Sequence, residues 1–260
     1  MIKPKKSLGQ NFLTDKNVLK KIVDKIEIEN KNVFEIGGGT GNLTEYLLLK
    51  RPKKLIVIEK DKNLFKSLVK KFQAYEKVII INEDILKFNI EKKLEKNSII
   101  FGNLPYNIST KIITNLVKFK NWPPKYEKLI LMFQKEVADR IVSESGSPNF
   151  GRLSILCGAR LSILSKFFVS KNCFYPKPKV DSSVLIFEPS NSQFLSFNEI
   201  IKLEKITNAL VSSRRKMISK KFNKIFKNVN LIYRNLNLKP SLRPENIEKE
   251  SYYKLIKYLN

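Results

Sequence analysis

The sequence predicts an α/β protein with a doubly wound, mostly parallel sheet and a small helical domain at its C-terminus. Short apolar runs of strand length recur through the first half of the chain, with amphipathic segments between them. Alternation of this kind is typical of parallel strands joined by crossover helices. After residue 189 the strand pattern ends, and apolar residues recur instead at helical spacing.

Five apolar runs predict the parallel strands: Asn32–Ile36, Leu55–Ile58, Val78–Ile81, Ser98–Phe101 and Leu129–Phe133. Between them, Asn42–Lys50 and Asp61–Phe72 carry apolar residues three and four positions apart, so we expect helices there. Two later runs, Lys166–Val169 and Val184–Glu188, are expected to add an antiparallel pair at the edge of the sheet. The complete sheet would then have seven strands.

The C-terminal part predicts helices at Phe197–Leu210, Arg214–Phe226 and Glu245–Leu259. The stretch Pro189-Ser190-Asn191-Ser192 consists of residues that favour turns, and it separates the two patterns. We therefore expect two domains, residues 1–189 and residues 190–260.

Composition restricts the chemistry. The 260 residues carry 50 Lys and Arg against 24 Asp and Glu, a formal net charge of +26, which favours a nucleic acid partner, although basic proteins also meet membrane surfaces. The chain has no His and only two Cys, without C-x-x-C spacing, so neither a metal site nor a histidine-based catalytic pair is expected. No apolar stretch is long enough to span a membrane, and we expect a soluble cytoplasmic protein.

A glycine-rich loop follows the first predicted strand. Glu35-Ile36-Gly37-Gly38-Gly39-Thr40-Gly41 leads directly into the helix that begins near Asn42. Glycines such as Gly37 and Gly39 let the backbone turn sharply and approach a ligand at the helix N-terminus. The spacing G-x-G-x-G differs from the G-x-G-x-x-G of dinucleotide enzymes, which favours a nucleotide-like ligand without a pyrophosphate.

Acidic residues follow the next two strands. Glu59 lies about twenty residues beyond the glycines, where its carboxylate can accept from ribose hydroxyls. Asp84 could accept from an adenine amine, with Ile85 packed on the ring. Either acid alone is more often a solvated charge at a strand end, but both together with the loop predict a site for an adenosine with a non-phosphate substituent, as in S-adenosylmethionine.

The tetrapeptide Asn103-Leu104-Pro105-Tyr106 follows a buried strand, where open α/β sheets place their chemistry. By itself it reads equally well as an ordinary Asn-x-Pro turn. Asn103 and a nearby carbonyl could also accept hydrogen bonds from a planar amine, while the ring of Tyr106 stacks on a base. The absence of His fits such chemistry, because it requires positioning and not a tuned side-chain base.

Several ordered motifs extend over nearly the whole chain. They are Leu8-Gly9-Gln10-Asn11-Phe12-Leu13, the glycine loop, Phe101–Thr110, Phe133-Gln134-Lys135-Glu136-Val137, Phe150-Gly151-Arg152-Leu153-Ser154, Phe174–Ser182, Arg214-Arg215-Lys216 and Arg243-Pro244-Glu245-Asn246-Ile247. As a set, they resemble the KsgA-type small-subunit ribosomal RNA adenine N6-dimethyltransferases. The resemblance implies a Rossmann-like methyltransferase sheet of seven strands and S-adenosylmethionine as cofactor.

The resemblance also implies the reaction and the residues that carry it. Members methylate N6 of two adjacent adenosines in a loop near the 3' end of small-subunit ribosomal RNA, giving N6,N6-dimethyladenosine during subunit biogenesis. We therefore expect a monomer that acts on an immature ribosomal subunit. The implied cofactor residues are Asn11, Leu13, Gly37, Glu59, Asp84 and Asn103, and the implied target-adenine residues are Asn103, Leu104, Pro105, Tyr106 and Phe174.

One departure and one basic cluster complete the expectations. Many relatives have Pro where this chain has Gly38, and the extra glycine is expected to loosen the loop. In the predicted helical domain, five positive residues lie within eight positions and suit phosphate contacts: Arg214, Arg215, Lys216, Lys220 and Lys221. We expect that removal of the residues after Pro189 weakens RNA binding and spares cofactor binding.

Three other functions fit parts of the sequence. The nearest alternative is the related large-subunit RNA adenine methyltransferases that confer macrolide resistance, although the sequence motifs at 103–107 and 243–247 favour the small-subunit enzymes. DNA adenine methyltransferases more often have Asp in place of Asn103. A non-catalytic RNA-binding factor on the same fold is the third, and the intact loop with Glu59 and Asp84 argues against it.

Overall fold

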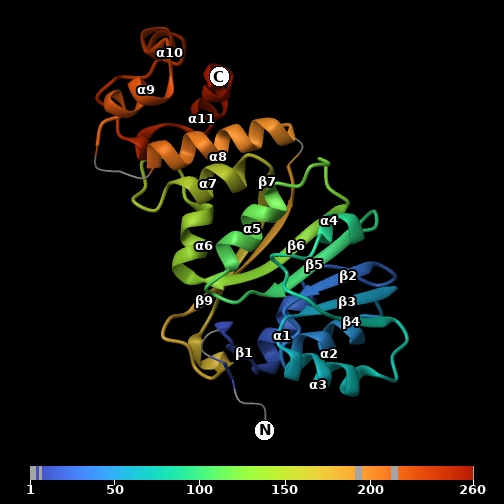
Figure 1. Ribbon diagram of the computed structural model, residues 1–260. Helices are drawn as coiled ribbons and strands as arrows, with labels where there is room; N and C mark the ends of the chain where they lie inside the picture. Colours follow the sequence, from blue (N-terminus) through green and yellow to red (C-terminus); the bar gives the residue numbers. More distant parts are fainter. Residues whose placement is uncertain (1–3, 6–7, 191–194, 212–215, 260) are drawn as a thin grey trace. The chain divides into compact units, whose positions relative to one another are not determined.

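The computed structural model describes residues 4–5, 8–190, 195–211 and 216–259. Its main feature is a seven-stranded sheet with the strand order β4-β3-β2-β5-β6-β9-β7 (Figure 1). The strands of this sheet are β2 (Asn32–Ile36), β3 (Lys54–Glu59), β4 (Val78–Asn82), β5 (Ser98–Asn103), β6 (Tyr126–Gln134), β7 (Leu161–Val169) and β9 (Ser182–Pro189). The five predicted parallel strands are thus confirmed.

The parallel pairing of the strands places their carboxyl ends at the same edge of the sheet. The neighbours β4, β3, β2, β5 and β6 all pair in parallel, and β9 pairs antiparallel with β6. The chain runs from β2 outward through β3 to β4, then returns to the other side of β2 to begin β5. The order of the strands therefore reverses between β2 and β5, which is the point where open α/β sheets bind ligands beyond the carboxyl ends.

Helices alternate with the parallel strands as the sequence predicts. They are α1 (Lys16–Val23), α2 (Asn42–Leu49), α3 (Lys62–Phe72), α4 (Ile90–Lys93), α5 (Ser109–Val117), α6 (Lys135–Val142) and α7 (Arg152–Gly158). Figure 1 shows α1, α2 and α3 grouped beside the β2–β4 part of the sheet. The two predicted edge strands, β9 and β7, are also neighbours at one side of the sheet.

A second, very small sheet was not expected from the sequence. Its strands β1 (Phe12–Leu13) and β8 (Phe174–Tyr175) pair antiparallel, with Phe12 opposite Tyr175 and Leu13 opposite Phe174. Two residues per strand give too short an apolar pattern to be read from sequence. This pairing ties the N-terminal segment to a loop more than 150 positions away.

Contacts divide the chain into two compact units. The first consists of residues 1–112, 124–138 and 163–189, and the second of residues 113–123, 139–162 and 190–260. The core of the first unit lies around the parallel strands, where Val33, Leu55, Ile99 and Phe101 are fully buried. The last segment of the second unit begins at Ser190, which directly follows β9.

The second unit is helical and is assembled from three parts of the chain. Its C-terminal elements are α8 (Phe197–Val211), α9 (Ser219–Ile225), α10 (Val229–Asn235), the 3-10 turns η3 (Pro244–Asn246) and η4 (Ile256–Tyr258), and α11 (Lys249–Leu255). Arg160 is completely buried there and donates to the carbonyl oxygens of Val117, Phe119 and Leu195. These bonds join all three parts of the unit, so a buried charge is fully partnered by backbone carbonyls.

Two predicted helices differ from the observed ones. The helix expected over 214–226 begins only at Ser219 as α9, and residues 212–215 lie outside the described part of the chain. The helix expected over 245–259 is divided, because Ile247 and Glu248 have extended backbones between η3 and α11. In the described part of the chain, no helix has the length and apolar character that a membrane span requires.

Candidate active site

A cavity lies in the first unit beyond the carboxyl ends of the parallel strands. Its wall is formed by residues 8–13, 35–40, 58–60, 83–85 and 103–108, together with three residues at the starts of α2 and α3. The segments that follow β2, β3, β4 and β5 therefore meet around one space, at the reversal of the strand order. All eight predicted cofactor residues line this cavity: Asn11, Leu13, Gly37, Gly39, Glu59, Asp84, Ile85 and Asn103.

The glycine loop forms one side of the cavity through backbone conformations that other residues rarely adopt. Gly37, Gly39 and Gly41 have φ values of 81°, 56° and 83°. This left-handed backbone bends the chain from β2 onto the start of α2, so Gly41 is the residue before the helix. The N–H groups at the start of α2 are thus directed toward the region that the loop encloses.

Gly38 is needed for packing. A Cβ atom at Gly38 would lie 2.4 Å from Cγ1 of Val57 and 2.9 Å from Cδ1 of Leu68. Both distances are far shorter than a carbon–carbon contact, so the neighbouring side chains of β3 and α3 already fill this space. The sequence led us to expect a looser loop, but the structure gives a different reason for glycine: the residue is buried against the core.

Glu59 supports the glycine loop from β3. Its Oε2 accepts from the N–H of Gly39 at 2.9 Å, and its Oε1 accepts from the N–H of Asp61 at 2.8 Å. Burial raises the pKa of Glu59, and these backbone hydrogen bonds act in the opposite direction. Since a carboxylate has about four acceptor sites, Glu59 can still accept from hydroxyl groups of a ligand.

Asp84 is held as a carboxylate at the end of β4. Its Oδ2 pairs with Nζ of Lys60 at 2.9 Å, and its Oδ1 accepts from the N–H of Leu86 at 3.0 Å. The hydrogen bond with Lys60 is the largest cause that lowers the pKa of Asp84. The ionised side chain therefore offers acceptors for an amine at the cavity wall, next to Ile85.

Asn103 has a defined orientation. Its Nδ2 donates to the carbonyl oxygen of Asn11 at 3.0 Å. Because a carbonyl oxygen can only accept, the NH2 group of the amide must be the end that faces Asn11. The other end, Oδ1, is the atom with which Asn103 can accept a hydrogen bond from a ligand in the cavity.

The rest of the tetrapeptide is also fixed. The carbonyl oxygen of Pro105 accepts from the N–H of Ile108 at 3.1 Å, so the chain turns directly into α5. The hydroxyl of Tyr106 lies 2.7 Å from Oγ of Ser182, the first residue of β9. Burial raises the pKa of Tyr106, which keeps its hydroxyl protonated and able to bond Ser182. Leu104, Pro105 and Tyr106 all line the cavity.

Phe174 differs from the other predicted site residues. It is only 4% exposed, belongs to the hydrophobic core, and is not among the residues that line the cavity. Its ladder partner Leu13 does line the cavity, so Phe174 lies one strand away from it. The next residue, Tyr175, is 60% exposed.

The predicted RNA-binding residues are divided by the structure. Arg214 and Arg215 lie outside the described residues, while Lys216 and Lys220 are exposed in the second unit. Lys221, by contrast, donates through Nζ to the carbonyl oxygen of Leu210 at the end of α8. Burial lowers the pKa of Lys221, in keeping with a side chain that is used within the unit.

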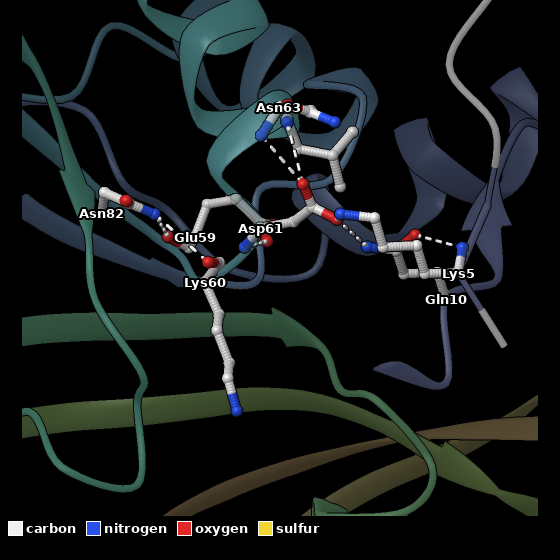
Figure 2. Close-up of polar contacts among 8 residues, drawn as sticks. Lys5, Gln10, Glu59, Lys60, Asp61, Asn63 and Asn82 are labelled. Carbon is white, nitrogen blue, oxygen red and sulfur yellow. Dashed lines mark hydrogen bonds and ion pairs between the residues drawn. The ribbon is translucent and has the colours of Figure 1, made fainter. Parts of the chain in front are cut away.

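Sequence reasoning missed several residues around the cavity. Asp61 caps α3 through Oδ1, while its Oδ2 pairs with Nζ of Lys5 at 2.7 Å and accepts from Nε2 of Gln10 at 3.3 Å (Figure 2). Burial alone would raise the pKa of Asp61, but the hydrogen bonds, above all that with Lys5, hold it below its usual value. An Asp at a helix start predicts a cap, but it gives no sign of a partner in the N-terminal segment.

Glu35 is the second missed residue. It is 1% exposed at the end of β2, and Oγ1 of Thr44 donates to its Oε2 at 2.6 Å. Burial raises the pKa of Glu35 to about 8. It begins the motif that the sequence assigned to the glycine loop, but a single buried acid within an apolar strand carries no local signal of its pKa.

The residues around the cavity suit a nucleoside-containing cofactor. They combine left-handed glycines, two carboxylates at neighbouring strand ends and apolar side chains such as Ile85 and Phe12. Carboxylates suit the hydroxyl and amino groups of adenosine, whereas a pyrophosphate would be repelled. Within the ranges described above, no group of three or more acidic or cysteine side chains is arranged to hold a metal ion.

Comparison with known sequences gives a consistent result. A family model described as ribosomal RNA adenine dimethylase matches residues 1–260. A protein of Pelagibacter ubique named ribosomal RNA small subunit methyltransferase A is 46% identical over 256 residues, which cover 98% of this chain and 97% of that protein. A protein of the same name from Malacoplasma penetrans is 38% identical, over 96% of this chain and 90% of the other.

Solved structures show the same fold. A dimethyladenosine transferase from Plasmodium falciparum superposes with a TM-score of 0.78 and 26% identity, over 94% of this chain and 95% of that one. The 23S rRNA methyltransferase ErmE superposes with a TM-score of 0.66 over 95% of this chain and 99% of its own, at 21% identity. At that identity, the second likeness concerns the fold alone.

Proposed function

Because the chain belongs to the ribosomal RNA adenine dimethylase family, we propose that it methylates N6 of two adjacent adenosines near the 3' end of small-subunit ribosomal RNA. The product would be N6,N6-dimethyladenosine, with S-adenosylmethionine as the methyl donor. The observation that carries the proposal is the orientation of Asn103, whose amide presents Oδ1 as an acceptor at the end of β5.

Adenine N6 is a weak nucleophile because its lone pair is delocalised into the ring. In the proposed reaction, Oδ1 of Asn103 accepts one of the two N6 hydrogens. The second acceptor is a backbone carbonyl, and Leu104 is favoured because the carbonyl of Pro105 already accepts from Ile108. Two such acceptors bias the nitrogen toward tetrahedral geometry and direct its lone pair, so catalysis rests on positioning and oriented dipoles.

The cofactor would be held by the residues that line the cavity. Glu59 would accept from the ribose hydroxyls, Asp84 from the adenine amine, and Ile85 would pack on the adenine ring. Asn11, Leu13, Gly37 and Gly39 would contact the rest of the cofactor from the N-terminal segment and the glycine loop. When bound, S-adenosylmethionine supplies an electrophilic methyl group on its sulfonium.

The target base must be unpaired or flipped, since N6 of a paired adenine is not available in this way. The ring of Tyr106 would contact one face of the base, and its bond to Ser182 supports a fixed ring position. We keep Phe174 as the proposed second face, although its ring is buried beside Leu13. Use of this ring would require a movement of β8 toward the cavity when RNA binds.

The partner proposed for this chain is an immature small ribosomal subunit in the cytoplasm, with the protein acting as a monomer. A net charge of +26 supports binding to a polyanion. In the second unit, exposed Lys216 and Lys220 are the described side chains that we propose for phosphate contacts, together with Arg214 and Arg215. Lys221 is less suited, because its amine is bonded within the unit.

The direct test is methyl transfer from labelled S-adenosylmethionine to small subunits that lack the modification, followed by nucleoside analysis of the RNA. We expect N6,N6-dimethyladenosine at two adjacent positions. The negative controls are small subunits that already carry the modification and large subunits; neither should incorporate label. Monomethyladenosine alone, or label in large-subunit RNA, would contradict the proposal.

A further inference from the structure

One wall of the cavity is formed by residues 8–13, which together with Lys5 we call the N-terminal segment. Residues 8–13 all line the cavity, facing the ends of the parallel strands. A cofactor in this cavity would be enclosed on that side by a piece of chain that belongs neither to the seven-stranded sheet nor to a long helix. How firmly this wall is held therefore determines how easily the cavity opens.

The C-terminal half of the segment is held by several bonds. Phe12 and Leu13 pair with β8, and the carbonyl oxygen of Leu13 accepts from Nδ2 of Asn42 at 2.8 Å. The carbonyl oxygen of Asn11 accepts from Asn103. This half is therefore held by backbone pairing with β8 and by hydrogen bonds from two side chains, those of Asn42 and Asn103.

In the N-terminal half, Gly9 packs against Asn107, and the side-chain hydrogen bonds of the described residues Lys5 and Gln10 meet at one carboxylate, that of Asp61. Its side chain is 2% exposed, and Oδ2 accepts from both Nζ of Lys5 at 2.7 Å and Nε2 of Gln10 at 3.3 Å. Oε1 of Gln10 in turn accepts from the backbone N–H of Lys5 at 2.7 Å. Figure 2 shows that these three residues close a ring, with Asp61 on one side and the segment on the other.

The same residue is bound firmly to the rest of the site. Oδ1 of Asp61 accepts from the N–H of Asn63 at 2.8 Å at the start of α3. Its own N–H donates to Glu59, the residue that also holds Gly39. Asp61 thus joins the N-terminal half of the wall to the start of α3 and to Glu59, the residue that we propose for binding the ribose.

We propose that Asp61 is a positioning residue that, through Lys5 and Gln10, latches the N-terminal segment over the cofactor and limits the rate of cofactor exchange. This inference rests on the proposed function, because four methyl transfers require four cofactor molecules and therefore repeated opening of the cavity. An ion pair with one partly exposed partner suits this role. It is strong enough to close the wall and weak enough to open on each cycle.

The latch can be weakened without removal of the helix cap. Asn caps helices about as well as Asp, so Asp61→Asn keeps the bonds to the start of α3 while it removes the charge. Lys5→Gln removes the other partner without any change in α3. For the wild type, both variants and the double variant, we would measure binding of S-adenosylmethionine by calorimetry and its dissociation rate by dilution of bound labelled cofactor.

We expect each single substitution to raise the dissociation rate about fivefold, as for one partly exposed charged hydrogen bond. The double variant should be no faster than Asp61→Asn, since both changes break the same contact. Lys5→Arg keeps the positive charge, so its dissociation rate should equal that of the wild type. A loss of α3 stability alone would not produce this non-additivity, nor rescue by Arg at a residue outside α3.

The matched control is the ion pair between Lys50 and Asp24, whose atoms lie 2.5 Å apart in the same unit and away from the cavity lining. Lys50→Gln and Asp24→Asn should leave the dissociation rate unchanged. Wild-type rates in both latch variants, or additive effects in the double variant, would overturn the latch. A wild-type chain that bound no S-adenosylmethionine would overturn the proposed cofactor, and the latch with it.

Discussion

Nδ2 of Asn103 donates a hydrogen bond to the carbonyl oxygen of Asn11 at 3.0 Å, between residues 92 positions apart. This one bond relates the N-terminal wall of the cavity to the residue proposed to grip the target amine. It decides which end of the Asn103 amide is available, because only the NH2 group can face a carbonyl oxygen. The position of the N-terminal wall and the orientation of Oδ1 of Asn103 are therefore linked.

Replacement of Asn103 by Asp should separate cofactor binding from methyl transfer. A carboxylate cannot donate to the carbonyl oxygen of Asn11, and repulsion between the two oxygens would turn the side chain away. We expect the single-turnover rate of methyl transfer to fall by roughly 100-fold or more, as for a misplaced reacting group. Labelled methyl transfer at saturating cofactor and RNA measures this rate.

The matched control for Asn103→Asp is Asn89→Asp. Asn89 caps α4 by accepting from the N–H of Lys92, and Asp performs this task equally well. Transfer at the wild-type rate by the control and a large loss in Asn103→Asp would support the orientation argument. An Asn103→Asp variant that kept full activity would show that the donated bond to Asn11 is not needed.

The bond between Tyr106 and Ser182 predicts a coupled pair. Tyr106→Phe and Ser182→Ala each remove one hydroxyl from the same contact, which we propose to fix the aromatic ring against the base. We expect each to lower kcat/KM for the RNA by about 3- to 10-fold. The double variant should lose no more than the worse single variant, because the contact can be lost only once.

Ser183 provides the control for this cycle. It is the next residue of β9 and is also buried, but its side chain points to the other face of the strand. Ser183→Ala combined with Tyr106→Phe should give additive effects on kcat/KM. Additivity in the Ser182 cycle as well would mean that the two hydroxyls act independently.

The sheet could be predicted from the sequence because its central strands are buried on both faces and read as apolar runs. The residues that line the cavity could be predicted because strand ends in a parallel sheet meet at one edge, so Glu59 and Asp84 had to approach the glycine loop. The contacts of Asp61 with Lys5 and of Tyr106 with Ser182 could not be predicted, because each joins side chains far apart in the sequence and no sequence pattern relates them.

The domain boundary shows the same difference between local and distant information. The end of β9 at Pro189 follows from a change of pattern, but the association of residues 113–123 and 139–162 with the C-terminal helices does not. Arg160 makes the point, because it donates to the carbonyl of Leu195 beyond the boundary. Removal of the residues after Pro189 would leave this buried charge partly unpaired, so point substitutions are the better test of RNA binding.

Two adjacent lysines offer that test. Lys220 is exposed, whereas the amine of Lys221 is bonded to the carbonyl of Leu210. We expect Lys220→Gln to weaken RNA binding and to reduce the slope of log affinity against log salt by about 0.7 to 0.9, as for one lost phosphate contact. Its melting temperature should stay at the wild-type value.

Lys221→Gln should do the reverse. It should lower the melting temperature by about 2 to 4 °C, since an internal hydrogen bond is lost, while the salt dependence of RNA binding changes little. Filter binding over a range of salt concentrations and thermal unfolding measure the two quantities. Equal effects of both substitutions on RNA affinity would contradict the division of roles.

Glu35 predicts a specific dependence of stability on pH. Burial raises its folded pKa to about 8, from an ordinary value of 4.5. Between these values the folded chain binds more protons at Glu35 than the unfolded chain, so its contribution to stability is complete below about pH 4.5 and is lost as the pH rises through 8. The loss should be on the order of a few kcal/mol in the free energy of unfolding.

Glu35→Gln removes this titration and keeps an oxygen that can accept from Thr44. Relative to the wild type, the variant should therefore become progressively more stable between pH 5 and pH 8, as measured by urea unfolding at several pH values. The control is Glu76→Gln, at an exposed residue of the same unit, which should follow the wild-type curve. Parallel curves for the wild type and Glu35→Gln would mean that Glu35 is ionised throughout this range, with the charge compensated by neighbouring groups.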